Sequence, residues 1–276
     1  MIAACLKWVD HRPEVDRLSG EVTTDPRTSG ASLADQAALE WALRLGATFG
    51  HGVVAVTSGP PEAEAVLREA LGAGAETAIR VDLPLAAPSG AVAAALASAL
   101  AGPVPVVVCG AGSLDRGSGS VPAFLAARLG AAQALGLITM TPPDRTSDLI
   151  GERRLDGGRR ERLRIPVPAV VSVEGSSARL RRAPLPRLIE ARRAAITVLP
   201  VRPGPGEATT APARTRPFRP RARVLPAPAA PLIAHQRILA LTGALVDREP
   251  PQTLVLDPPE AATEVLDHLR RWGYLP

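Results

Sequence analysis

The stretch VTSGPPEAEAVLREALGAGAETAIRVD, residues 56–82, decides the fold of this chain. It continues an apolar run that begins at His51, and the adjacent valines of that run are typical of a buried strand. After a Ser-Gly-Pro-Pro turn, leucines and alanines recur at helical spacing, with charged residues on the opposite face. Two glycines are expected to end this helix, and residues 78–81 form the next apolar run. A strand, a helix and a second strand make a βαβ unit, which predicts a parallel sheet with a nucleotide-sized crevice beyond the strand ends.

The same alternation extends in both directions along the chain. Four crossovers of this kind predict an α/β fold with an open, doubly wound, mainly parallel sheet of Rossmann-like type. A Gly-Gly turn between short polar strands within 152–165 predicts a hairpin added at the sheet edge, and Pro168 to Val173 predicts a further buried strand. The other strands are expected at Ile2 to Leu6 and near 52–57, 78–82, 104–109 and 136–140, with helices at Asp35 to Leu45, 90–101, 120–130 and Glu260 to Trp272.

Composition bears on the size of the core and on whether the chain binds nucleic acid. The chain has 276 residues, and 46% of them are hydrophobic, which is enough for a large core. The formal charge of +5 could indicate a nucleic-acid partner. The basic residues do not alternate with aromatics that could stack on bases, so an arginine-rich surface without nucleic acid is the preferred interpretation.

Cysteine usage and the chain start predict a cytoplasmic protein. Cys5 and Cys109 each lie in an apolar run without metal-ligand spacing, which favours buried thiols in a reducing compartment and no metal. Lys7 and Asp10 interrupt the apolar start, so no signal peptide is expected. Residues 83–114 carry no charge, but glycine and prolines divide them into a helix and a strand, so no membrane insertion is expected.

The loop GAGSLDRGSGSVPAF, residues 110–124, is the best candidate for a binding site. It follows a predicted strand and leads into a helix, so its backbone N–H groups could hold a phosphate. Its spacing is neither that of a Walker loop nor G-x-G-x-x-G, and a plain turn remains the alternative.

The amino-acid sequences of several segments resemble motifs of the beta subunit of electron-transfer flavoproteins. Residues 56–82 resemble that family's Gly-Pro turn followed by "LR-x-ALA-x-GAD", and CLKWVD at 5–10 resembles its opening "VKxVPD". DQAALEWALRL at 35–45 resembles "DExAxEEALRL", and 155–175 resembles "xEGGxExxxxxLPAVVTV". The loop 110–124 resembles "GKQAIDxDTxQVGP" of that family, which wraps the phosphate of a bound AMP.

The resemblance implies an AMP site in this chain, next to FAD held mainly by an alpha subunit. Departures from the family pattern remove side-chain donors: its Lys-Gln is Ala111-Gly112 here, and its second Asp is Gly117. The usual Asn-Pro-Phe is Ser32-Leu33-Ala34, which removes an aromatic expected near the flavin. AMP, a second FAD or no ligand therefore remain open for this crevice. The implied cofactor-binding residues are Cys5, Leu6, Lys7, Ser32, Leu33, Ala34, Asp35, Thr57, Ser58, Gly59, Gly110, Asp115, Gly117, Ser118, Gly119, Ser120 and Val121.

The resemblance also implies the partners. APLPRLIEARR at 183–193 resembles "ASLPNIMKAKK", in which the leucine anchors dehydrogenases, and Leu185 occupies that position. A leucine between two prolines could instead simply pin a turn. The chain would then be an electron carrier in a heterodimer, serving flavin-dependent dehydrogenases and passing electrons to a quinone oxidoreductase and the respiratory chain. No catalytic constellation is expected, because the flavin carries the chemistry.

Three segments are expected along the chain. They are a nucleotide-binding α/β domain at 1–199, a Pro/Arg-rich linker at 200–231, and a C-terminal arm and helix at 232–276 that packs on a partner subunit. REPPQ at 248–252 resembles the "DPPQR" of the family's arm, whereas the helix could equally pack on its own domain.

Other functions stay open at this point. A stand-alone adenine-nucleotide-binding regulator of the universal-stress type would share the crevice, and a nucleic-acid binder could use the Pro/Arg linker as a tether. Within the flavoprotein class, a divergent branch associated with mycofactocin in actinobacteria is a further hypothesis.

Overall fold

The computed structural model describes residues 1–16, 18–100, 102–141, 148–200, 231–242 and 253–275. The chain divides into two units, Met1–Phe218 and Arg219–Pro276, and each is considered by itself. The predicted linker falls almost wholly outside the described residues, as does the predicted arm motif at 248–252.

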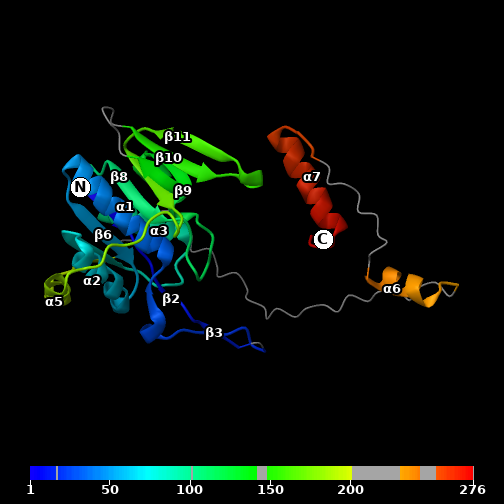
Figure 1. Ribbon diagram of the computed structural model, residues 1–276, viewed down its shortest axis with the longest axis horizontal. Helices are drawn as coiled ribbons and strands as arrows, with labels where there is room; N and C mark the ends of the chain where they lie inside the picture. The colour runs from blue at the N-terminus through cyan, green and yellow to red at the C-terminus, as the bar shows by residue number, and fades with distance from the viewer. Residues whose placement is uncertain (17, 101, 142–147, 201–230, 243–252, 276) are drawn as a thin grey trace. The chain divides into compact units, whose positions relative to one another are not determined.

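A single large sheet forms the centre of the first unit (Figure 1). Within the described residues it has nine strands in the order β11-β10-β9-β12-β8-β1-β6-β7-β13. The run from β9 to β13 in this order is parallel, and β10 and β11 are antiparallel additions at the β9 edge. The strands are β1 Ile2–Cys5, β6 Val53–Ser58, β7 Thr77–Asp82, β8 Val106–Gly110, β9 Ala132–Thr141, β10 Leu149–Arg154, β11 Arg160–Ile165, β12 Ala169–Val173 and β13 Thr197–Pro200.

The predicted fold class is confirmed, and so is the added hairpin. β10 and β11 pair across the Gly-Gly turn, where Gly157 and Gly158 have positive φ angles of 69° and 75°. Periodicity did not predict the neighbours of the strands. β12 lies between β8 and β9, and β13 adds an edge beside β7.

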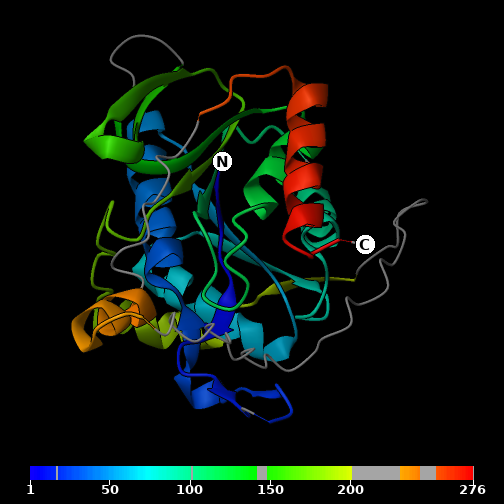
Figure 2. The same ribbon diagram turned by 90° about the vertical axis from the view of Figure 1, so that its right-hand side faces the viewer.

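Helices cover both faces of the sheet. The α-helices of this unit are α1 Leu33–Phe49, α2 Glu64–Ala73, α3 Ser89–Ala99, α4 Val121–Leu129 and α5 Leu185–Arg193, and short 3-10 turns are η1 Pro26–Thr28, η2 Pro61–Ala63 and η3 Asp156–Gly158. Figure 2 shows α1 on one side of the strands and α3 and α4 on the other. The predicted helices lie where these helices form, although α1 begins two residues before Asp35 and continues past Leu45.

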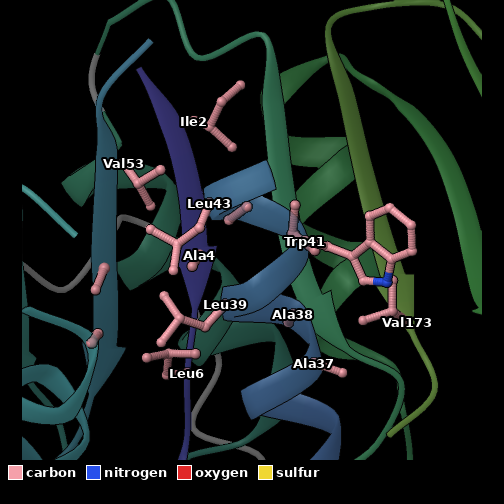
Figure 3. Close-up of a cluster of buried hydrophobic side chains, with 14 of the residues drawn as sticks. Ile2, Ala4, Leu6, Ala37, Ala38, Leu39, Trp41, Leu43, Val53 and Val173 are labelled. Carbon is pink, nitrogen blue, oxygen red and sulfur yellow. The ribbon is translucent and has the colours of Figure 1, made fainter. Parts of the chain in front are cut away.

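Two apolar layers result from this arrangement, because successive side chains of a strand point to opposite faces. Ile2 and Ala4 of β1 pack with α1 and α2, whereas Ala3 and Cys5 pack with α3 and α4. Figure 3 shows the first layer, in which Leu39 of α1 faces β1. Alanine, valine and leucine make up most of each layer, as the low aromatic content predicts, and Trp8 and Trp41 are the buried aromatic residues of the first layer.

The segment between β1 and α1, which was predicted as a polar loop, contains short strands. β2 (Trp8–Asp10) pairs with β5 (Ser29–Ala31), and β3 (Glu14–Val15) pairs with β4 (Val22–Thr23). Asp10 organises this segment by accepting hydrogen bonds from the backbone N–H groups of Arg12 and Asp25 and from the Thr28 hydroxyl. These strands have two or three residues each, which is too short for a periodic pattern to show.

The second unit contributes the helices α6 Ala234–Thr242 and α7 Pro258–Arg271. The predicted C-terminal helix is present, beginning two residues earlier, and the Asp257 carboxylate caps it by accepting from the Glu260 N–H. Its apolar side chains Val265 and Leu266 are exposed. No helix within the described part of the chain has both the length and the apolar character needed to cross a bilayer.

Candidate functional site

The strand order reverses direction at the pair β1 and β8. From β1 the chain proceeds to β6 and β7 on one side, and then returns through α3 to β8 on the other side. Connections that leave neighbouring strand ends in opposite directions open a crevice at the carboxyl edge of a parallel sheet. A pocket of about 830 Å3, counting space open to solvent, lies at this point.

The pocket has a polar side and an apolar side. The polar side combines the ends of β1 and β8 with the loop that joins β8 to α4, and the apolar side comes from the β7–α3 connection and α3. The lining residues are Cys5, Leu6, Lys7, Asp35, Ser58, Pro84, Leu85, Ala87, Ser89, Val92, Leu96, Cys109, Gly110, Gly112, Ser113, Arg116, Ser118, Gly119, Ser120, Val121 and Pro122.

Asp35 is the buried carboxyl group of the lining. It lies in the first turn of α1, where the Ser32 hydroxyl caps the helix by accepting from the Asp35 N–H at 3.2 Å and donates to the Asp35 carboxylate at 2.8 Å. Burial raises the pKa of Asp35 to about 6, against the lowering effect of the Ser32 hydrogen bonds and of Lys7. This side chain therefore changes charge near neutral pH and faces the pocket.

Gly110 lets the end of β8 approach α1 closely. A Cβ at this position would lie 2.8 Å from the Asp35 carboxylate and 3.1 Å from the Ala34 carbonyl carbon. These contacts are shorter than side chains tolerate, so a glycine is needed for this approach.

Lys7 and Asp115 join the end of β1 to the β8–α4 loop. The Lys7 ammonium donates to an Asp115 carboxylate oxygen at 2.6 Å and to the Ser113 hydroxyl at 3.5 Å. Partial burial alone would raise the pKa of Asp115, but the hydrogen bonds from Lys7 and Ser113 outweigh it and lower the pKa. The two charges offset each other at the edge of the pocket.

The two cysteines lie side by side among the residues that line the pocket. Cys5 and Cys109 are direct partners in the pairing of β1 with β8, and both are free and buried. The hydrogen bond with Cys5, together with burial, raises the pKa of Cys109, so its thiol stays protonated. Within the described residues, no group of three or more His, Cys, Asp or Glu side chains could hold a metal ion.

The end of β6 and the turn that follows it lie at the same edge of the sheet. The Thr57 hydroxyl donates to the Leu6 carbonyl at 2.8 Å, and Ser58 reaches the lining. The Gly59 carbonyl accepts from the Arg80 guanidinium at 2.9 Å. Arg80 is buried and also donates to Asp82 at 2.8 Å. Sequence reasoning missed this arginine, because a charged residue within a strand gives no sign of the turn it supports.

The structure brings most of the sequence-predicted residues to one place. The Ser32 hydroxyl is hydrogen-bonded to Asp35, and Ala34 lies close to the Gly110 backbone. Leu33, by contrast, is 73% exposed. Thr57, Gly59, Asp115 and Gly117 support the pocket without lining it. The predicted residues that do line the pocket are Cys5, Leu6, Lys7, Asp35, Ser58, Gly110, Ser118, Gly119, Ser120 and Val121.

Arg116 and the apolar wall were not predicted. The wall belongs to the uncharged stretch after β7. Pro84 and Pro88, which lie between β7 and α3, were the only sign in the sequence of a defined loop before α3. Arg116 occupies a variable position of the loop motif, so the resemblance assigned it no role.

Leu185 lies at a separate surface. It is the first residue of α5 and is 69% exposed, and the neighbouring Leu188 and Ile189 are also exposed. The helix is fixed to α2 through Arg68, whose guanidinium donates to the Ala191 carbonyl at 3.0 Å and to two further carbonyls at the end of α5. Leu185 thus begins an anchored helix and does not pin an isolated turn.

The chain also matches a known protein family over most of these elements. The family model for the electron transfer flavoprotein domain matches residues 25–203, which is more than half of the chain. The chain belongs to this electron transfer flavoprotein family. The match extends from η1 to β13 and includes the β8–α4 loop and α5.

Individual relatives agree with the family match. Protein FixA of Rhizobium meliloti is 36% identical over 172 residues, which cover 59% of this chain and 58% of that protein. Protein FixA of Bradyrhizobium diazoefficiens is 31% identical over 171 residues, covering 59% of each chain. Protein FixA of Sinorhizobium fredii is 32% identical over 208 residues, covering 71% of this chain and 72% of that protein. The chain thus spans about three fifths of the length of the first two relatives.

These matches confirm the resemblance to electron-transfer flavoprotein beta subunits that the sequence motifs indicated. They do not favour a stand-alone regulator of the universal-stress type. The mycofactocin-associated branch stays a prediction, because none of these relatives bears on it.

Proposed function

We propose that this chain is the beta subunit of a heterodimeric electron-transfer flavoprotein. It binds AMP in the pocket at β1 and β8 and helps to hold FAD carried mainly by an alpha subunit. The complex takes electrons from flavin-dependent dehydrogenases and passes them through a quinone oxidoreductase towards the respiratory chain.

One observation carries the nucleotide part of this proposal. The pocket lies at the switch point of a doubly wound sheet, and it is lined by the three segments whose motifs resemble the family's AMP site. These segments come from β1, from the start of α1 and from the β8–α4 loop, which are distant in the sequence. Their convergence on one pocket supports a common ligand.

The residues present fit an adenine nucleotide. Leu85, Val92 and Leu96 offer an apolar wall against which a flat base can pack. The β8–α4 loop offers backbone N–H groups and serine hydroxyls, and Gly117 and Gly119 hold it in shape with positive φ angles of 63° and 58°. Backbone donors in such a loop suit a phosphate, and they do not depend on the side chains that this sequence lacks.

The flavin, when bound in the complex, supplies the electron-accepting and electron-donating chemistry. This chain's own residues would bind and orient the nucleotide, keep water from the apolar wall and set the charge at the sheet edge. Asp35 and Lys7 are the ionisable groups that set this charge beside the β1 strand end.

The surface around Leu185 is the proposed docking site for dehydrogenases. α5 presents three exposed large apolar side chains, Leu185, Leu188 and Ile189. Arg181 pairs with Glu40, but Arg187 forms no ion pair among the described residues, so the apolar patch has a positively charged rim. The exposed arginines without an ion pair among the described residues of 179–193 are Arg179, Arg182, Arg187, Arg192 and Arg193.

Co-expression tests the proposal. The chain should co-purify with an electron-transfer flavoprotein alpha subunit as a yellow 1:1 complex whose flavin is reduced by a dehydrogenase and its substrate. A chain that purifies alone as a stable homodimer binding ATP, and that never associates with an alpha subunit, would contradict it.

A further inference from the structure

The pocket lining contains three charged side chains, and they are not equivalent. Lys7 is neutralised by Asp115, to which its ammonium donates at 2.6 Å. Asp35 is buried and can become a carboxylate as the pH rises. Arg116 forms no ion pair with any carboxylate in the described part of the chain. Among these three groups, Arg116 is therefore the cation whose charge no carboxylate of the described residues offsets.

Arg116 is a lining residue of the pocket, and its guanidinium contacts another lining residue, Ala87. One of its amino groups donates to the Ala87 carbonyl at 2.8 Å, and this contact joins the β8–α4 loop to the β7–α3 connection. The Arg116 backbone N–H donates to the Asp115 carboxylate at 2.9 Å, so the residue is fixed at its base. The remaining guanidinium donors have no partner among the described residues, and Arg116 is exposed to solvent.

We infer that Arg116 binds the phosphate of the nucleotide and exchanges its contact with the Ala87 carbonyl for that anion. The inference rests on the proposed nucleotide site and names the residue that selects a phosphorylated ligand. A guanidinium presents two parallel donors that match phosphate oxygens, and such charge-assisted bonds are stronger than a bond to a neutral carbonyl. The exchange is therefore favourable when a phosphate enters.

The sequence of the loop supports this role. The resembling motif carries a lysine immediately after its first glycine, where this chain has Ala111. Arg116 restores a cation to the loop, five positions further along. Without it, the lining would hold Lys7, whose charge Asp115 offsets from outside the lining, and the Asp35 carboxylate, which leaves a net negative charge that repels phosphate.

The test compares AMP with adenosine, which lacks the phosphate. Binding of each to the full-length chain is measured by calorimetry at neutral pH for the unaltered protein, Arg116→Gln and Arg116→Lys. Arg159→Gln is the matched control, because Arg159 is also exposed and also donates to a backbone carbonyl, that of Asp156, on the β10–β11 hairpin.

We expect Arg116→Gln to weaken AMP binding about 10- to 100-fold and to leave adenosine binding unchanged, because a hydrogen bond between charged groups is lost. Arg116→Lys should retain part of the AMP affinity, and Arg159→Gln should retain all of it. Equal losses for AMP and adenosine would show that Arg116 only ties the two loops together, and no loss for either would also overturn the inference. If the unaltered chain binds neither ligand, the proposed nucleotide site fails together with the inference.

Discussion

Replacing Asp35 by Asn should change the pH dependence of stability in a defined way. Asp35 is 6% exposed, and its carboxyl group has a pKa of about 6 in the folded chain, against an ordinary value of 3.8. The amide has nearly the same shape, cannot ionise and can still accept the hydrogen bond from Ser32. The substitution therefore removes the ionisation and keeps the packing.

The size of the effect follows from the difference between the two pKa values. That difference is about 2 units, and each unit corresponds to about 1.4 kcal/mol, so ionisation of Asp35 costs about 3 kcal/mol of folding free energy. Because the folded-state pKa is the higher one, the folded chain binds the proton more tightly than the unfolded chain does. The stability contributed by the protonated group is complete below pH 3.8 and is lost as the pH rises to about 6.

The assay is urea unfolding followed by circular dichroism at a series of pH values from about 4 to about 7.5, without added nucleotide. The useful quantity is the difference in unfolding free energy between Asp35→Asn and the unaltered chain at each pH. Other carboxylates contribute equally to both proteins, so their effects cancel. One of them is Asp10, whose pKa is lowered by its hydrogen bond with Thr28. We expect the variant to match the unaltered chain near pH 4 and to be about 3 kcal/mol more stable near pH 7.5.

A difference that does not vary with pH would refute this reasoning, because it would mean that Asp35 does not titrate in this range. A variant that is less stable than the unaltered chain at every pH would show that the carboxylate is stabilised by contacts that the amide cannot replace.

Three further predictions concern the core, the sheet edge and the docking surface. Leu67→Ala should lower the unfolding free energy by about 2–5 kcal/mol in urea titrations, because this fully buried side chain of α2 leaves a cavity. Gly110→Ala should lower it by about 1–3 kcal/mol and weaken nucleotide binding in calorimetry, since its Cβ would meet Asp35 and Ala34; unchanged affinity would show that this approach does not shape the pocket. Leu185→Ala should alter stability by less than about 0.5 kcal/mol, because the side chain is exposed, while slowing reduction of the flavin complex by a dehydrogenase in stopped-flow measurements; an unaltered rate would argue against docking at α5.

Much of the fold could be predicted from local patterns. The segment 56–82 contains a strand, a turn, an amphipathic helix and a second strand within one short stretch, and β6, α2 and β7 form there. A pattern along the chain carries no information about which strands become neighbours. The insertion of β12 between β8 and β9 could therefore not be foreseen, and neither could β13 at the far edge.

The candidate site shows the same limit in chemical terms. Its backbone positions followed from the motif resemblance, since a glycine-rich loop after a strand has a known use. The raised pKa of Asp35 arises from burial beside β8, and the position of Arg116 depends on a carbonyl 29 residues away in the chain. Both properties come from tertiary contacts, which the spacing of residues in the sequence does not encode.

The nucleotide content of this protein is tested most directly by mass spectrometry of the small molecules released from the purified complex of this chain with its alpha subunit. We expect AMP and FAD in equal amounts, one of each per heterodimer, because the pocket at β1 and β8 holds the AMP and the partner holds the FAD. FAD without any AMP, two FAD molecules per heterodimer, or the absence of both nucleotides would contradict this expectation.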